Sequence, residues 1–145
     1  MSEVLISNVS FYDKDYFNEF LKNNNKHFSI GSPADFWVSF YKDLLREVIN
    51  DEVDESFRDR ELGNKQIKQI QKVFERELEN KLPDIESIPE AGGPINEVIE
   101  WKGQEYRLCL SLTKPISRQV SDFYKIISIC KECLLESKPM YLSIE

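Results

Sequence analysis

The longest regular pattern in the chain is a stripe of apolar residues between Ile116 and Leu134. Its members are separated by four, three, four, three and four positions: Ile116, Val120, Phe123, Ile127, Cys130 and Leu134. This spacing places them on one face of an α-helix. We therefore predict a helix over 116–137 that is ended by Pro139. The fold must supply an apolar surface against which the apolar face of this helix can pack.

Two more long helices are predicted upstream. Ser32 is followed by proline and, three positions after it, by Asp35, which is the order of a helix start. Apolar residues recur at every fourth position from Phe36 to Val48, so we expect this helix to continue into the acidic stretch 50–62, where Gly63 would stop it. The next helix is predicted over 65–81, with Asn64 as its cap and Pro83 after its end. Its apolar stripe comprises Ile67, Ile70, Phe74 and Leu78.

The clearest strand signal is a β-hairpin, in which Glu97–Trp101 and Glu105–Thr113 flank the turn Lys102-Gly103-Gln104. Apolar residues alternate with polar ones along its second strand, which is typical of a half-buried strand. These apolar residues are Tyr106, Leu108, Leu110 and Leu112.

Strands are also expected at the two ends of the chain. Met140, Leu142 and Ile144 alternate with polar residues and predict a C-terminal strand. Residues 4–11 are apolar and β-branched enough for an N-terminal strand, and a short helix over 14–23 is expected after it. The segment HFSIGS that follows is interpreted as a loop.

These elements predict an α+β fold, because strands and helices are mostly segregated along the chain. We expect one domain, 1–145, in which an antiparallel sheet packs against three or four helices. The hairpin and the C-terminal strand would form this sheet, and the N-terminal strand would add to its edge. A chain of 145 residues fits one domain. No apolar run approaches the roughly 20 residues that span a bilayer, and we expect a complete cytoplasmic protein.

Acidic residues are concentrated in the middle of the chain. The net charge is −7; the segment from Asp43 to Leu62 has eight acidic and three basic residues, and that from Glu75 to Glu105 has nine and three. Such a field repels nucleic acid and anionic membranes and attracts a basic protein. We therefore expect neither a nucleic acid nor a membrane as partner.

Common catalytic and metal-binding patterns are missing. A calcium loop starting at Asp51 would need a glycine at its sixth position and a glutamate at its twelfth, where the chain has Ser56 and Leu62. Cys130 and Cys133 form a C-x-x-C pair inside a helical pattern without a second ligand pair, so we interpret them as small buried apolar residues and reduced thiols. His27 is the only histidine. We expect no metal, no cofactor and no catalytic residue.

One set of residues does resemble a known catalytic signature. Pro83-Asp84, Glu100 and Lys102 are similar to the PD-(D/E)xK pattern of metal-dependent nucleases. In that family the two acids hold a divalent cation and the lysine helps to activate water, and Glu75 or Glu77 would supply a helix carboxylate. This resemblance implies a metal-dependent nuclease, which we keep as an alternative function.

The acidic stretch is the candidate partner-binding surface. If the helix that begins at Pro33 continues past Asn50, four acids lie on one side of it: Glu47, Asp51, Asp54 and Glu55. Asp59 adds a further charge. Aromatic residues near such a field would be the anchors of an interface, and Phe57 and Trp101 are the candidates.

A small acidic α+β chain of this kind resembles the immunity proteins of bacterial contact-dependent growth-inhibition and polymorphic-toxin systems. That resemblance lies in the size, charge and architecture of the whole chain. It implies a non-enzymatic protein that binds a basic, nuclease-type toxin domain and blocks its active site. A third class, an accessory or structural protein that forms homo-oligomers, also fits the composition.

Overall fold

The fold is described from a computed structural model. It describes residues 3–8, 10, 27–31, 41, 43–45, 48, 57–85, 97–108 and 115–144. Helices and antiparallel strands make up an α+β fold, as the sequence predicts. In chain order the elements are β1 Glu3–Ser7, β2 His27–Gly31, β3 Phe57–Leu62, α3 Asn64–Lys81, the 3₁₀-helix η2 Leu82–Asp84, β4 Glu97–Trp101, β5 Gln104–Leu108, α4 Pro115–Leu135 and β6 Met140–Ile144.

Four strands form an antiparallel sheet in the order β2-β1-β6-β3. The two strands from the ends of the chain are its centre: Val4 lies opposite Ile144, and Ile6 lies opposite Leu142. Val4, Ile6 and Leu142 are fully buried. The N-terminal strand was expected at an edge of the sheet, and this prediction is wrong, because β2 pairs with its other side.

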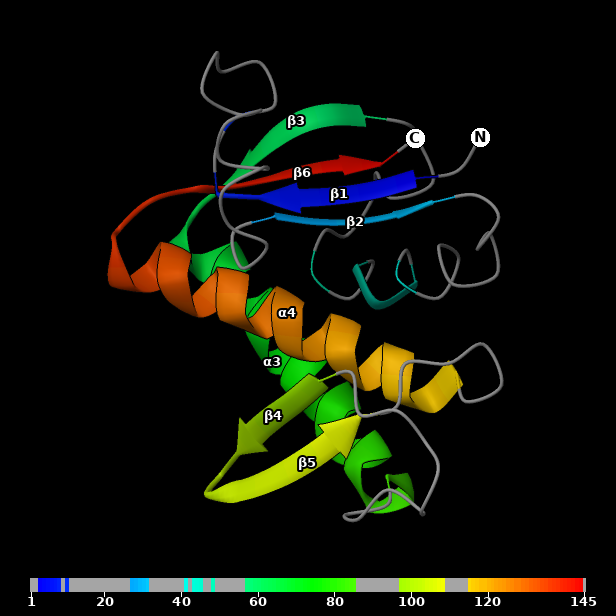
Figure 1. The fold of residues 1–145 in the computed structure, drawn as a ribbon. Helices are drawn as coiled ribbons and strands as arrows, with labels where there is room; N and C mark the ends of the chain where they lie inside the picture. The colour runs from blue at the N-terminus through cyan, green and yellow to red at the C-terminus, as the bar shows by residue number, and fades with distance from the viewer. Residues whose placement is uncertain are drawn as a thin grey trace.

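The hairpin of β4 and β5 forms a separate two-stranded sheet. Helices α3 and α4 lie between this hairpin and the four-stranded sheet (Figure 1). The predicted hairpin is confirmed, with Lys102 and Gly103 both at positive φ, 50° and 83°, as its two turn residues. Gln104, which was expected in the turn, is instead the first residue of β5 and pairs with Trp101. The expectation that the hairpin and the C-terminal strand share one sheet is wrong, since β6 pairs with β1 and β3.

Helix α3 buries the predicted stripe of Ile67, Ile70, Phe74 and Leu78. It packs closely on α4, whose Val120, Phe123, Ile127 and Cys130 are buried and whose Leu134 is partly buried, as predicted. The start of α3 differs from the prediction: Gly63 occupies the N-cap and no side chain caps the helix, while Asn64 is already helical. No described helix is long and apolar enough to cross a membrane.

Three aromatic rings meet where α3 and α4 cross. Phe74 and Phe123 have ring centroids 5.8 Å apart, and Tyr41 lies 5.9 Å from Phe74 and 6.0 Å from Phe123. The hydroxyl of Tyr41 donates a hydrogen bond of 3.0 Å to Asp122. Burial, followed by the nearby charge and hydrogen bond of Asp122, raises the pKa of Tyr41 well above its usual value. This pair satisfies a polar group inside the core.

The two outer strands of the large sheet were not predicted. The segment HFSIG was interpreted as a loop, but His27–Gly31 is the strand β2. The stretch 57–62 was expected to be helical, but it is the strand β3, paired with β6. A register shift between Phe57 and Arg60 interrupts that pairing. Charged side chains and bulges of this kind are common on edge strands.

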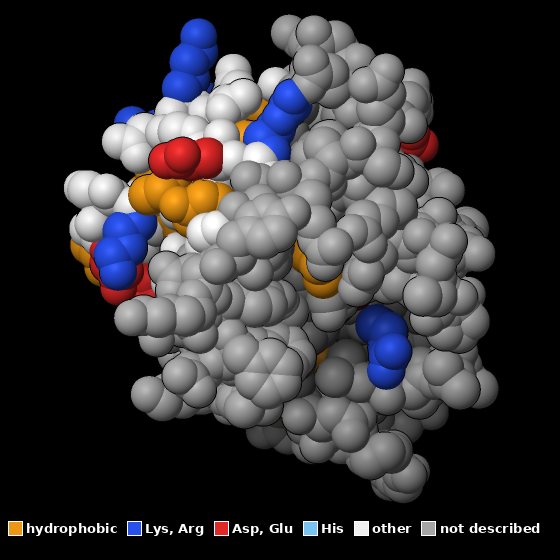
Figure 2. Space-filling view, turned by 90° about the horizontal axis from the view of Figure 1, so that it is seen from above, with side chains coloured by type: hydrophobic (Ala, Val, Ile, Leu, Met, Phe, Trp, Pro, Cys, Tyr) orange, Lys and Arg blue, Asp and Glu red, His pale blue; other side chains and the backbone are white. Residues whose placement is uncertain are grey.

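The turn between α4 and β6 carries a helix end of the Schellman type. Ser137 has φ 54°, and Lys138 N donates to the Cys133 carbonyl at 2.9 Å. Leu135 just before it is 86% exposed. Basic, acidic and hydrophobic side chains lie together at the left of Figure 2, the side on which Figure 1 places this turn.

Candidate functional site

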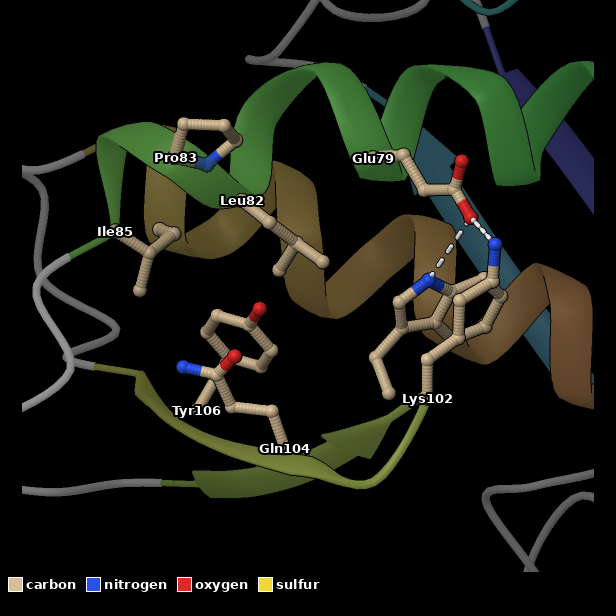
Figure 3. A pocket seen from close by; sticks show the side chains of 8 residues that line it. Glu79, Leu82, Pro83, Ile85, Lys102, Gln104 and Tyr106 are labelled. Carbon is tan, nitrogen blue, oxygen red and sulfur yellow. Dashed lines mark hydrogen bonds and ion pairs between the residues drawn. The ribbon is translucent and has the colours of Figure 1, made fainter.

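A groove of about 500 Å³ lies between the end of α3 and the hairpin. Pro83 cannot continue a helix, so the chain leaves α3 through η2 and turns back toward the hairpin. Figure 3 shows α3 and η2 along one side of the groove and the hairpin along the other. The residues that line this hairpin groove are Glu79, Leu82, Pro83, Ile85, Trp101, Lys102, Gln104 and Tyr106.

The carboxylate of Glu79 ties the hairpin to α3 at one end of this groove. Its Oε1 accepts a hydrogen bond of 3.2 Å from the indole Nε1 of Trp101 and lies 2.5 Å from Nζ of Lys102 (Figure 3). The hydrogen bonds from Lys102 and then Trp101 lower the pKa of Glu79. The same ion pair raises the pKa of Lys102. Both side chains are exposed, 42% for Glu79 and 72% for Lys102, so a partner can reach them.

Trp101 lines the groove with a side chain that is mostly buried. It is only 8% exposed, and Nζ of Lys131 from α4 lies 5.1 Å from the centroid of its ring. A cation at that distance is attracted to the face of the ring. The predicted anchor Trp101 therefore contributes an edge of indole to the groove instead of a projecting side chain.

The rest of the groove is amphipathic. Leu82 and Ile85 are buried apolar residues, and Tyr106 faces them from β5 (Figure 3). Gln104 lies two positions before Tyr106 and so on the same face of the strand. The polar groups of Tyr106, Gln104 and Glu79 therefore surround an apolar floor. Such a groove suits an extended peptide, or a side chain with an apolar stem and a polar tip.

The predicted acidic face is only partly described. Phe57 and Asp59 lie in the strand β3, where the sequence predicted a helix, and their role as partner contacts stays a prediction. The other four predicted contacts lie outside the described residues: Glu47, Asp51, Asp54 and Glu55.

Of the nuclease-like residues, Glu100 and Lys102 have different surroundings, and the side chain of Asp84 lies outside the described part of the structure. Glu100 is exposed on β4, on the strand face opposite to Trp101, while Lys102 lies in the turn and pairs with Glu79. Glu105 faces Glu100 across the hairpin. Asp84 belongs to η2. Among the residues that the structure describes, no three His, Cys, Asp or Glu side chains lie close enough to hold a metal ion.

The interpretation of the C-x-x-C pair as buried apolar residues is confirmed. Cys130 is fully buried and Cys133 is 1% exposed, both as free thiols in α4. Burial raises the pKa of Cys133 to about 11 and shifts that of Cys130 further in the same direction. Such thiols are poor nucleophiles and poor metal ligands.

Sequence reasoning missed the groove itself. The alternation along β5 already placed Tyr106 on the buried side of that strand, and Pro83 already marked the end of α3. What the sequence did not show is that the hairpin turns back onto the end of α3, because that contact joins residues 22 positions apart, Glu79 and Trp101.

Comparisons with known proteins gave no relative. No protein-family model matches the chain, and neither the curated proteins nor the solved structures give a significant match.

Proposed function

We propose that the chain is a protein-binding module for a basic partner, and most concretely an immunity protein that neutralises a basic toxin domain. The observation that carries this proposal is the Glu79 carboxylate at the mouth of the hairpin groove. It accepts bonds from Lys102 and Trp101 and remains 42% exposed beside an aromatic and apolar floor.

The charges of the chain support a basic partner. Its net charge is −7, and one of its two acidic segments, Glu75 to Glu105, includes the residues that close the groove. A lysine or arginine of the partner has a counter-charge in Glu79, and its aliphatic stem has Leu82 and Tyr106 to pack on. The acidic stretch at Asp51 and Asp54 supplies further charge that speeds association with a positive surface.

The test uses the domain encoded immediately upstream of this gene, expressed alone and together with the chain. We expect co-expression to restore growth of cells that the upstream domain inhibits. The purified pair should bind, and the double substitution Asp51→Lys, Asp54→Lys should weaken binding at least about tenfold at low salt. The salt dependence of binding should also become flatter.

Two controls make this test decisive. Glu136→Lys reverses one charge at a residue outside the hairpin groove and should leave binding intact. Unchanged affinity and salt dependence in the double variant would reject the acidic stretch, and unchanged affinity in Glu79→Gln would reject the groove. Cleavage of DNA or RNA by the chain with Mg²⁺ or Mn²⁺, lost in Glu100→Ala, would replace the proposal with the nuclease function.

A further inference from the structure

A second groove, of about 540 Å³, lies at the other end of α3. It runs between the first half of that helix and Leu134 near the end of α4. We call it the lysine groove, because three lysines are among its lining residues: Lys65, Lys68, Gln69, Gln71, Lys72, Glu75 and Leu134. It shares no residue with the hairpin groove.

The three lysines form one positive face. Lys65, Lys68 and Lys72 are spaced by three and four positions on α3, so they project from the same side of the helix, and all are exposed. Among the described residues, no carboxylate lies within ion-pair distance of any of them. The carboxylate of Glu75, at the far end of the groove, accepts a hydrogen bond of 2.8 Å from Gln71.

These lysines place a cluster of positive charge at this end of α3. The first turn of the helix contains no acidic residue. The helix dipole adds a partial positive charge at the same end. This sign is opposite to that of the chain as a whole, which has a net charge of −7.

The same surface is partly apolar. Leu134 is half-buried in the wall of the groove. Leu135, the next residue along the chain, does not line the groove; it is 86% exposed and is one of two large hydrophobic side chains that the described residues leave open to solvent. An apolar wall beside a row of unpaired lysines matches a segment that carries leucine-like residues on one side and carboxylates on the other.

We propose that the lysine groove docks an acidic amphipathic helix of a second protein. Charge complementarity decides between this occupant and others. A long nucleic acid or an anionic membrane presents negative charge over a surface much larger than the groove, and the net charge of −7 of the chain repels it. A short helix covers the groove alone. The proposal is independent of the hairpin groove and of a basic partner there.

The probe is a synthetic helical peptide with leucines along one stripe and glutamates elsewhere, titrated into the isotope-labelled protein at low salt. Backbone amide signals of Lys65, Lys68 and Lys72 and of Leu134 should shift most. The triple substitution Lys65→Glu, Lys68→Glu, Lys72→Glu should weaken binding at least about tenfold. Leu134→Ser should weaken it severalfold, because it removes the apolar wall of the groove.

A control is Arg118→Glu, which reverses one exposed charge at the opposite end of α4 and should leave the affinity unchanged; its single-site counterpart in the groove is Lys68→Glu, which should weaken binding. A peptide with lysine in place of glutamate should not bind at this end. The unfolding midpoint of each variant shows whether it is folded. If the Lys→Glu triple variant is not folded, the milder triple variant with glutamine at the same three positions replaces it. Absence of binding, shifts centred elsewhere, equal binding by the triple variant, or tighter binding to anionic lipid vesicles or duplex DNA would overturn the proposal.

Discussion

At the scale of single residues, the Glu79 carboxylate provides a pH-sensitive contact. Its pKa lies below the ordinary value of 4.5, because Lys102 and Trp101 donate to it. A lowered pKa means that the ion pair is intact at neutral pH and is lost only as the pH falls through the folded-state value. Since both side chains are largely exposed, the effect on stability is small. The indole signal of Trp101 is the more sensitive reporter.

We expect the indole N–H resonance of Trp101 to titrate with a midpoint below 4.5. The chain has two tryptophans, so Trp37→Phe leaves one indole signal to follow. Glu79→Gln should abolish this titration, because an amide does not change charge. Glu77→Gln, whose side chain contacts Arg76 instead, should preserve it. A midpoint that is the same in Glu79→Gln would show that another acid is responsible.

At the scale of elements, the turn after α4 contains a serine, Ser137, that we expect glycine to replace with a gain in stability. Ser137 has φ 54°, a left-handed conformation that costs a serine more than a glycine. We expect Ser137→Gly to raise the free energy of unfolding by up to about 1 kcal/mol, measured by urea denaturation. The matched control is Ser128→Gly inside α4, which should lower it by about 0.5–1 kcal/mol. A loss of stability in Ser137→Gly would contradict the strain argument.

The elements also show how far sequence reasoning reaches. The positions of α3, α4, β6 and the hairpin follow from periodicity, because each buries a regular face. The outer strands β2 and β3 were not predicted from periodicity, for different reasons. In β2 only Phe28 and Ile30 alternate with polar residues, between a run of asparagines and Gly31, which favours a loop, whereas β3 has the sequence FRDREL, with four consecutive charged residues. Its strand character comes from pairing with β6, a partner about 80 positions away that local patterns cannot identify.

At the scale of the whole molecule, α3 connects two regions of opposite charge. Its first half carries Lys65, Lys68 and Lys72 beside the lysine groove, and its last turns carry Glu79 at the hairpin groove. The sequence showed the segregation of charge along the chain. It did not show that one helix presents a positive groove at one end and a carboxylate at the other, because that depends on how α4 and the hairpin pack around it.

The packing of that helix pair predicts how the molecule unfolds. Cys130 and Cys133 lie in α4 with at most 1% of their surface exposed, and burial holds the pKa of Cys133 at about 11, so neither is an accessible thiolate at neutral pH. A disulfide reagent can reach them only when α4 separates from α3 and the sheet. Because these elements share one core cluster, we expect that opening to be the global unfolding event.

The variant Cys109→Ala removes the third thiol. In it, Cys130 and Cys133 should react at the same rate, and the logarithm of that rate should rise with urea along the slope of equilibrium unfolding. Ser128→Gly should accelerate both reactions by the factor that its loss of stability implies. Faster, urea-independent labelling of Cys133 would instead show that the end of α4 opens by itself.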